Sequence, residues 1–251
     1  MTTVVLIADP PVEGAGDCSD VVSRTPIPEN DGPVLYRAVL KDVFSALAES
    51  TVDVLVNYPS PEDVPDSADL DRSPETILRG IAGAVVDPDR LEDFRFEVQV
   101  GSDFSAKAGN AITHLLDSED RTSAAVLRPC VPRLVRSVLD EASIKLRRTE
   151  VVLGPAGNGE VYYAGFTEPI DFTDVFEDRP LEEIAGRAGE SGMRVDFLRN
   201  RGVLGSETDL ASEITRVRAE RLAGKQVPSH FAAFVADRGL SVDDGEIVET
   251  T

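Results

Sequence analysis

The residues best suited to contact a ligand lie in a loop between two apolar, strand-like runs. The chain reads Val-Val-Leu-Gly-Pro over 151–155 and Val-Tyr-Tyr-Ala-Gly-Phe over 161–166, with Ala-Gly-Asn-Gly-Glu between them. A strand that breaks into a Gly/Pro/Asn loop and returns as an aromatic strand is the strongest indication of a site in this sequence. Asn158, Glu160 and Tyr162 are therefore candidate substrate-binding residues.

The same stretch also has a purely structural interpretation. Asn158-Gly159 is the strongest tight-turn signal in the chain, because both residues tolerate positive φ, so an ordinary hairpin is as good a prediction as a substrate loop. Successive side chains of a strand point to opposite faces, so at most one of Tyr162 and Tyr163 lines a pocket.

Other chemistry finds little support. His114 and His230 are far apart in sequence and lack a suitable partner, so packed or surface imidazoles are expected. There is no Gly-x-Ser-x-Gly elbow, no Cys/His pairing and no Walker-type or Gly-x-Gly-x-x-Gly loop. Cys18 and Cys130 are too few and too distant in sequence for a disulfide framework or a zinc site, so reduced thiols are expected.

Charge limits the partners. The chain has 46 acidic and 25 basic residues, a formal net charge of −21, and only four lysines. We therefore do not expect nucleic acid or anionic membranes as partners, because the negatively charged protein repels them. Because salt of about 1 M shortens the screening length to about 3 Å, the composition suggests a salt-rich cytoplasm, with an ordinary acidic mesophilic protein as the alternative.

The N-terminal residues carry no basic leader, and no window approaches the roughly 18 apolar residues needed to span a bilayer. The sequence thus predicts an untargeted cytoplasmic protein.

Strand-like runs alternate with helical patterns along the chain. Strands are predicted at 3–8, 52–57, 94–100, 124–127 and 193–198, and helices at 33–49, 74–85, 103–116, 132–147, 181–190, 207–222 and 228–239. This alternation predicts an α/β fold with a mostly parallel central sheet, helices on both faces and a β-hairpin near 149–166. One domain over 1–240 and an acidic flexible tail over 241–251 are expected.

Two long segments without periodicity, 9–32 and 58–73, follow predicted strands. Ligands of open α/β sheets usually sit outside the carboxyl ends of the strands. The first of these loops is therefore a reasonable place for a binding site.

Several segments in chain order between Thr3 and Leu222 resemble motifs of the radical-SAM/selenodomain-associated family of transferases. They are Val-Ser-Arg-Thr over 22–25 with Leu-Tyr-Arg over 35–37, the run 99–108 from Gln99 to Ala108, Arg-Pro-Cys-Val-Pro-Arg-Leu over 128–134, the loop 154–163, and the run 203–210. The resemblance implies a GT-A fold of the nucleotide-diphospho-sugar transferase type.

The resemblance also implies that metal-binding carboxylates have been replaced. Cys130 stands at the position of the proposed metal-binding aspartate, Asn158 replaces an aspartate, and Gly205 falls within the family's Asp-x-Asp pattern, of which only Asp209 remains. Such transferases stabilise a leaving diphosphate with Mg²⁺ or Mn²⁺ held by carboxylates, whereas a thiol prefers softer metals. Metal-assisted transfer should therefore be impaired.

Phosphate binding could still come from Arg24, Lys107 and Arg128, because guanidinium groups grip phosphate with two hydrogen bonds. Solvated arginines paired with an acidic surface are the alternative. Asp103 is a candidate metal ligand or ribose contact, but it precedes a helical run, where aspartate is a favoured cap.

The sequence thus predicts a transferase-like protein that binds a nucleotide or nucleotide sugar and has weak or no activity. It offers no metal site, and Mg²⁺ or Mn²⁺ is expected only if some activity remains. The alternative is a non-catalytic binding or regulatory protein on the same fold.

Overall fold

The computed structural model describes residues 1–12, 18–64 and 72–249, apart from the side chains of Ser19, Asp20 and Arg24. Its centre is a seven-stranded sheet with the order β3-β2-β1-β4-β6-β5-β7. The strands are β1 (Thr2–Ile7), β2 (Asp53–Tyr58), β3 (Arg95–Val98), β4 (Ser123–Leu127), β5 (Val151–Pro155), β6 (Val161–Phe166) and β7 (Val195–Phe197). Only β6 runs antiparallel to its neighbours.

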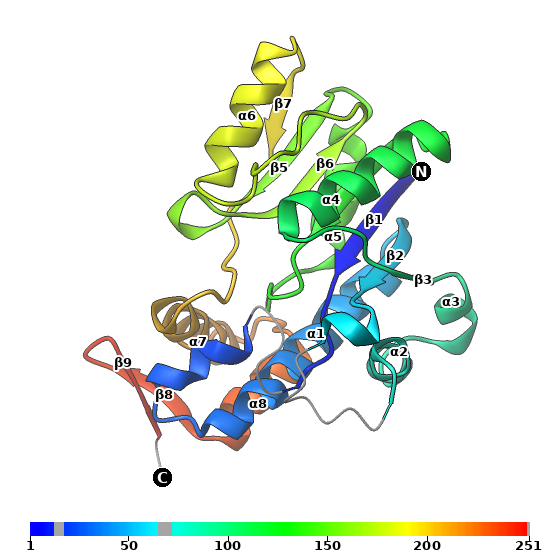
Figure 1. Ribbon diagram of the computed structural model, residues 1–251. Helices are drawn as coiled ribbons and strands as arrows, with labels where there is room; N and C mark the ends of the chain where they lie inside the picture. Colours follow the sequence, from blue (N-terminus) through cyan, green and yellow to red (C-terminus); the bar gives the residue numbers. More distant parts are fainter. Residues whose placement is uncertain (13–17, 65–71, 250–251) are drawn as a thin grey trace.

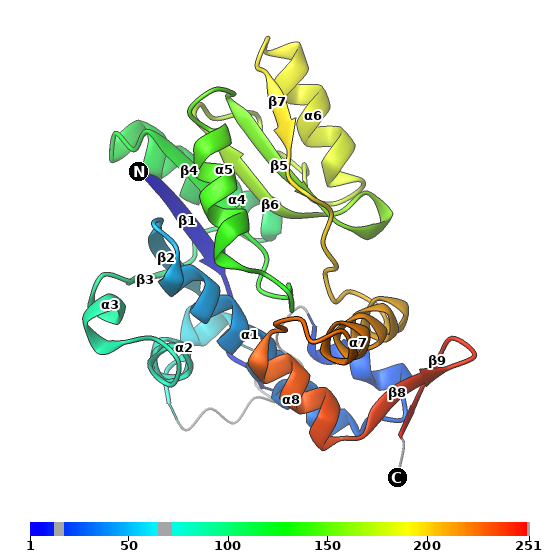
Figure 2. The same ribbon diagram turned by 180° about the vertical axis from the view of Figure 1, so that it is seen from behind.

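Helices cover both faces of this sheet, as Figures 1 and 2 show from opposite sides. One face carries α4 (Phe104–Thr113) and α6 (Pro180–Glu190), and the other carries α1 (Gly32–Glu49), α2 (Pro74–Gly83) and α5 (Arg136–Lys145). The shorter elements are η1 (Ser19–Arg24), η2 (Glu29–Asp31), η3 (Pro61–Asp63), α3 (Pro88–Glu92), η4 (His114–Ser118) and η5 (Gly157–Gly159). The predicted α/β class is confirmed.

The core is divided by the sheet into two apolar layers. β1 and β4 are buried along their whole length, which explains why both read as apolar runs rather than as alternating patterns. In α1, Leu35, Val39 and Val43 are fully buried on the stripe that faces the sheet.

The C-terminal part differs from the expected flexible tail. After α7 (Glu207–Leu222) and α8 (Ser229–Asp237), strands β8 (Leu240–Asp243) and β9 (Glu246–Glu249) form an antiparallel hairpin, and residues 250–251 lie outside the described part. Asp244 and Gly245 turn the chain with positive φ, and Leu240 and Ile247 are buried. The acidic composition concealed a hairpin signal, because Asp-Gly is a favoured two-residue turn.

All strands of the seven-stranded sheet except β6 point the same way, so their carboxyl ends lie at one edge of that sheet. The loops after β4 and β7 and the β5–β6 turn meet at this edge, which we call the carboxyl edge. Among the helices that the structure describes, none is both long and apolar enough to cross a membrane.

Candidate functional site

A pocket of about 340 Å³ lies at the carboxyl edge, and we call it the front pocket. Three segments distant in sequence form it: the start of the loop after β4, the β5–β6 turn, and the connection from β7 to α7. Its lining residues are Arg128, Ala156, Gly157, Asn158, Glu160, Val203, Leu204, Gly205, Ser206 and Asp209. The structure therefore brings together three of the predicted site residues, Arg128, Asn158 and Glu160.

The β5–β6 turn has the geometry that its sequence predicts. Asn158 (φ 58°, ψ 25°) and Gly159 (φ 82°) both adopt the left-handed region, and the Glu160 N–H donates to the Gly157 carbonyl at 3.0 Å. Two consecutive positive φ values define the hairpin turn that matches the twist of its strands. The tight-turn prediction is confirmed, and the turn also forms one wall of the front pocket.

Arg128 is the central charged group of this edge. Its guanidinium lies 3.0 Å from a carboxylate oxygen of Glu160 and 4.6 Å from the centre of the Phe104 ring. Its side chain is 18% exposed, and its Nε is buried without a hydrogen-bond partner in the described part of the chain. Arg128 thus keeps a charge close to the pocket surface with hydrogen-bonding capacity unused.

A smaller cavity of about 150 Å³ adjoins this arginine on the side of β1. Its lining residues are Ile7, Asp9, Tyr36, Phe104, Lys107 and Pro129. Because the Arg128 guanidinium contacts Phe104 here and Glu160 in the front pocket, it stands between the two cavities, which together we call the front site. Lys107 supplies a second cation at this site, as the sequence suggested.

Both carboxylates of the front pocket have partners within the protein. Glu160 pairs with Arg128, and Asp209 accepts hydrogen bonds from the Ser206 hydroxyl at 2.7 Å and the Gly205 N–H at 3.4 Å. The Ser206 hydroxyl in turn accepts from the Asp209 N–H, so these two residues cap α7 reciprocally. Asp209 therefore takes part in the N-terminal cap of α7.

The donor set does not fit a hard divalent cation. Cys130 is fully buried and its carbonyl accepts from the Leu204 N–H, while Gly205 has no side chain. Within residues 1–12, 18–64 and 72–249, no three Asp, Glu, His or Cys side chains converge as a metal site would require. Mg²⁺ and Mn²⁺ need several oxygen ligands in close geometry, which these side chains do not supply.

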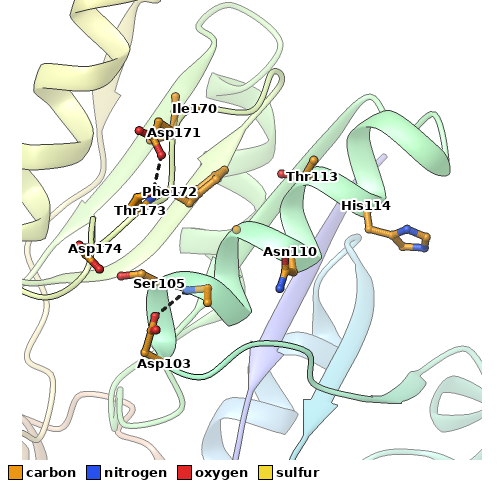
Figure 3. Close-up of a pocket in the computed structure, with 12 residues that line it drawn as sticks. Asp103, Ser105, Asn110, Thr113, His114, Ile170, Asp171, Phe172, Thr173 and Asp174 are labelled. Atoms are coloured by element: carbon orange, nitrogen blue, oxygen red, sulfur yellow. Dashed lines mark hydrogen bonds between the residues drawn. The ribbon is translucent and has the colours of Figure 1, made fainter.

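Asp103 lies outside the front site. It caps α4, accepting from the Ala106 N–H at 2.8 Å, and this hydrogen bond lowers the pKa of its carboxyl. The residue lines a separate groove of about 600 Å³ between α4 and the 170–174 segment (Figure 3). There the Ser105 hydroxyl accepts from the Phe176 N–H and Asp171 from the Thr173 N–H, so these polar groups serve the fold. The capping interpretation of Asp103 is confirmed.

Tyr162 departs from its predicted role. Both Tyr162 and Tyr163 are buried, and the Tyr162 hydroxyl donates to the Arg199 carbonyl at 3.1 Å. Burial raises the pKa of Tyr162 to about 12. An added Cβ on Gly154 would lie 2.6 Å from the Tyr162 ring, so β5 carries glycine there to admit the ring into the core. Tyr162 therefore lies in the core and does not line the front pocket.

Two further predictions concern single side chains. The side chain of Arg24 lies outside the described part of the chain. His114 is a surface residue, with its side chain 61% exposed and its Nε2 3.6 Å from Glu119. Of the two alternatives expected for His114, a packed or a surface imidazole, the structure shows the second.

Asp9 and Phe104 line the front site although the sequence did not single them out. Asp9 comes two residues after the end of β1, and the rule that ligands lie at strand carboxyl ends could have identified it. Phe104 gave no signal of its own, because only the fold reveals its contact with Arg128.

Comparisons with known proteins agree with this architecture. Residues 76–182 match a family described as "Uncharacterized protein conserved in bacteria (DUF2064)". A search of curated protein sequences found no match.

Solved structures show the fold. The chain is similar to a candidate nucleotide-diphospho-sugar transferase from Desulfovibrio desulfuricans G20, with 18% identity, 94% of each chain covered and a TM-score of 0.71. It is also similar to a cytidylyltransferase from Leptospira borgpetersenii serovar Hardjo-bovis (strain JB197), with 10% identity, 94% of each chain covered and a TM-score of 0.51. The protein thus has a transferase-like fold of the nucleotide-diphospho-sugar type.

Proposed function

We propose that this protein binds a nucleotide or nucleotide sugar at the front site and that its metal-dependent transfer activity is weak or absent. The fold supports the ligand class, because both similar structures are described as transferases of this chemistry and each is covered over 94% of its length. The position of the front site at the carboxyl edge supports the location.

The observation that carries the proposal is the placement of Arg128 between two cavities, facing Glu160 on one side and Phe104 on the other. A diphosphate spanning the two cavities would meet the guanidinium at its centre, and Lys107 would supply a second positive charge. Guanidinium groups bind phosphate oxygens through paired, charge-assisted hydrogen bonds. In the free protein, Glu160 takes the place of that phosphate.

The same arrangement argues for slow chemistry. A leaving diphosphate is normally neutralised by a divalent cation. Here Glu160 is paired with Arg128 and Asp209 caps a helix, so a metal ion would have to compete with both interactions. The protein's own cations then provide the main neutralisation. If they do not suffice, the protein is a binding or regulatory protein on the transferase fold, which is the alternative function.

Calorimetric titration in KCl tests the proposal, using nucleoside triphosphates and UDP-, GDP- and ADP-sugars with and without Mn²⁺. We expect at least one ligand to bind, and Mn²⁺ to change its affinity less than about tenfold, which is about 1.4 kcal/mol. The variant Arg128→Ala should abolish binding. Absence of binding by the whole panel would refute the proposal, and strong Mn²⁺-dependent binding with turnover would refute the claim of impaired metal chemistry.

Arg79→Ala is the matched control. Arg79 also pairs with a glutamate, Glu75, at 2.8 Å and lies 4.0 Å from the centre of an aromatic ring, that of Phe96. It lines neither cavity of the front site. Loss of ligand binding in Arg79→Ala would mean that the Arg128→Ala effect comes from general destabilisation or net charge.

A further inference from the structure

A second groove, of about 880 Å³, lies between α1, the start of α5 and α7. Figure 2 shows these helices on the side that faces the viewer. The connection from β7 to α7 contributes to both recesses: residues 199–201 line this groove, and residues 203–206 line the front pocket. We call it the arginine groove.

The charge of the arginine groove is opposite to that of the whole chain. Basic residues are outnumbered by acidic ones in the sequence, 25 to 46. The groove reverses this ratio, with three acidic lining residues and six basic ones, which are Arg133, Arg136, Arg199, Arg201, Arg216 and Lys225. A concave surface lined by one sign of charge focuses the electrostatic field.

Two of the three acidic lining residues already have partners, and one of them neutralises part of the groove's own charge. Asp42 accepts hydrogen bonds from the N–H groups of His230 and Phe231 at 3.1 and 2.8 Å, at the start of α8. Glu220 pairs with Arg133 at 3.2 Å and with Arg216 at 3.5 Å. Arg136 pairs with Asp140 at 2.9 Å, so the positive charge that has no close carboxylate lies on the three remaining basic residues of the groove.

Three cations of the groove have no carboxylate within 4.0 Å among the residues that the structure describes. Arg199 and Lys225 are exposed and form no ion pair there. Arg201 is partly buried, donates from Nη1 to the Arg133 carbonyl, and has a buried Nε without a partner. Burial, together with the nearby Arg133 and Arg216, lowers the pKa of the Arg201 guanidinium.

This arrangement of cations carries an electrostatic cost. Like charges repel more strongly where burial lowers the local dielectric constant, and a buried N–H without an acceptor loses its hydrogen bond to water. An anion placed among the arginines would offset the repulsion between them. A surface of solvated arginines, by contrast, would leave no N–H buried and unpaired.

We propose that the arginine groove is a binding site for a multiply charged oxyanion, the phosphate groups of a small molecule. The groove is larger than a single phosphate requires and falls in the size range of small-molecule sites. Guanidinium groups suit phosphate because they offer paired donors in fixed geometry. Nucleic acid does not fit, because the net charge of −21 repels a long polyanion outside the groove.

Inorganic pyrophosphate is the probe, titrated calorimetrically at the lowest KCl concentration that keeps the protein folded. The double variant Arg199→Gln/Lys225→Gln removes two exposed, unpaired cations and should leave the fold intact. We expect its Kd for pyrophosphate to rise about tenfold or more, equal to about 1.4 kcal/mol. Circular dichroism establishes that the variant is folded under the same conditions.

Two controls separate this site from other anion binding. Arg147→Gln/Arg148→Gln makes the same change of net charge at exposed positions outside the groove and should leave the Kd unchanged. Arg128→Ala removes the central cation of the front site and should leave the Kd of the arginine groove unchanged, while any separate pyrophosphate binding at the front site is lost. Absence of pyrophosphate binding would overturn the proposal. A Kd that changes only in Arg128→Ala would also overturn it, as would a Kd that changes equally in the two double variants.

The two proposals fail in different ways. If nucleotides do not bind, the front-site proposal fails, while pyrophosphate binding that needs Arg199 and Lys225 still supports the arginine groove. If pyrophosphate binds only through Arg128, the arginine-groove proposal fails and the front site stands.

Discussion

Two arginine–glutamate pairs begin in the same loop after β4 and end in very different surroundings. Arg128 pairs with Glu160 at 3.0 Å with side chains 18% and 40% exposed, at the front pocket. Arg133, five residues later, lines the arginine groove and pairs with Glu213 at 2.5 Å, with side chains 9% and 6% exposed. Both pairs join a guanidinium to a glutamate carboxylate, and they differ strongly in burial.

This difference in burial gives the two pairs different roles: the exposed pair lies at the proposed binding site, and the buried pair supports the fold. A buried charge pair depends on both partners, because removal of one leaves the other without water or counter-charge. The Glu213 carboxylate also lies against Gly202, where an added Cβ would collide with it. Under the proposed function, the Arg128–Glu160 pair exchanges Glu160 for a ligand, whereas the Arg133–Glu213 pair, which we call the rear pair, packs against the connection from β7 to α7. We therefore expect the same substitution to have opposite consequences at the two places.

The largest effect should come from Glu213→Gln. This change keeps the side-chain shape but leaves Arg133 with only Glu220, at 3.2 Å, as a counter-charge. The free energy of unfolding should fall by about 3 kcal/mol, the lower end of the range for a broken buried pair. Chemical denaturation followed by circular dichroism measures it. A fall in the free energy of unfolding of less than about 1 kcal/mol would mean that the Arg133–Glu213 pair contributes no more than an exposed pair, and the two pairs would then not differ in their role.

The second largest effect concerns salt and separates buried from exposed charge. If the acidic surface destabilises the fold by self-repulsion, raising KCl to about 2 M should increase Tm, because the screening length then falls below about 3 Å. We expect about 4 °C or more, since about 1 kcal/mol shifts Tm by about 2–4 °C in chains of this size. The stability loss in Glu213→Gln should persist in high KCl, as that pair is shielded from the solvent. An unchanged Tm would favour an acidic mesophilic protein.

Tyr162→Phe should have a smaller effect, and it tests on which side of the sheet this residue acts. Loss of the hydroxyl removes its hydrogen bond to the Arg199 carbonyl, so stability should fall by about 1 kcal/mol. Nucleotide binding at the front site should not change. A variant of unaltered stability with weaker nucleotide binding would return Tyr162 to the front site, as the sequence suggested.

Most elements of the fold follow from the sequence because their apolar spacing is unambiguous. The stripe Leu35, Val39 and Val43 predicts α1, and the run Val4-Val5-Leu6-Ile7 predicts β1. The helix expected from Pro132 instead begins at Arg136, and the preceding turn directs Arg133 to the rear pair. A periodic pattern indicates that a helix exists but fixes its first residue poorly.

The site was predicted less completely, because its contacts join distant segments. Arg128, Asn158 and Glu160 were found because strand ends and turn residues mark them in sequence. Tyr162 was predicted to line a pocket but is buried, since alternation along a strand does not say whether a face meets solvent or a second core layer. The arginine groove gave no signal, because its six cations come from three separate segments and meet only in the fold.

The smallest effect on stability should be that of Glu160→Gln, the front counterpart of Glu213→Gln. Exposed pairs contribute about 1 kcal/mol or less, so the free energy of unfolding should change by no more than that. Nucleotide affinity should instead rise a few-fold, because Arg128 loses its competing carboxylate and the ligand's phosphates lose a nearby negative charge. Calorimetry on the nucleotide that binds the unmodified protein measures this, with Glu75→Gln, which frees Arg79, as the control. Weaker binding in Glu160→Gln would mean that the carboxylate itself contacts the ligand, and Glu160 would then be a positioning group rather than a stand-in for phosphate.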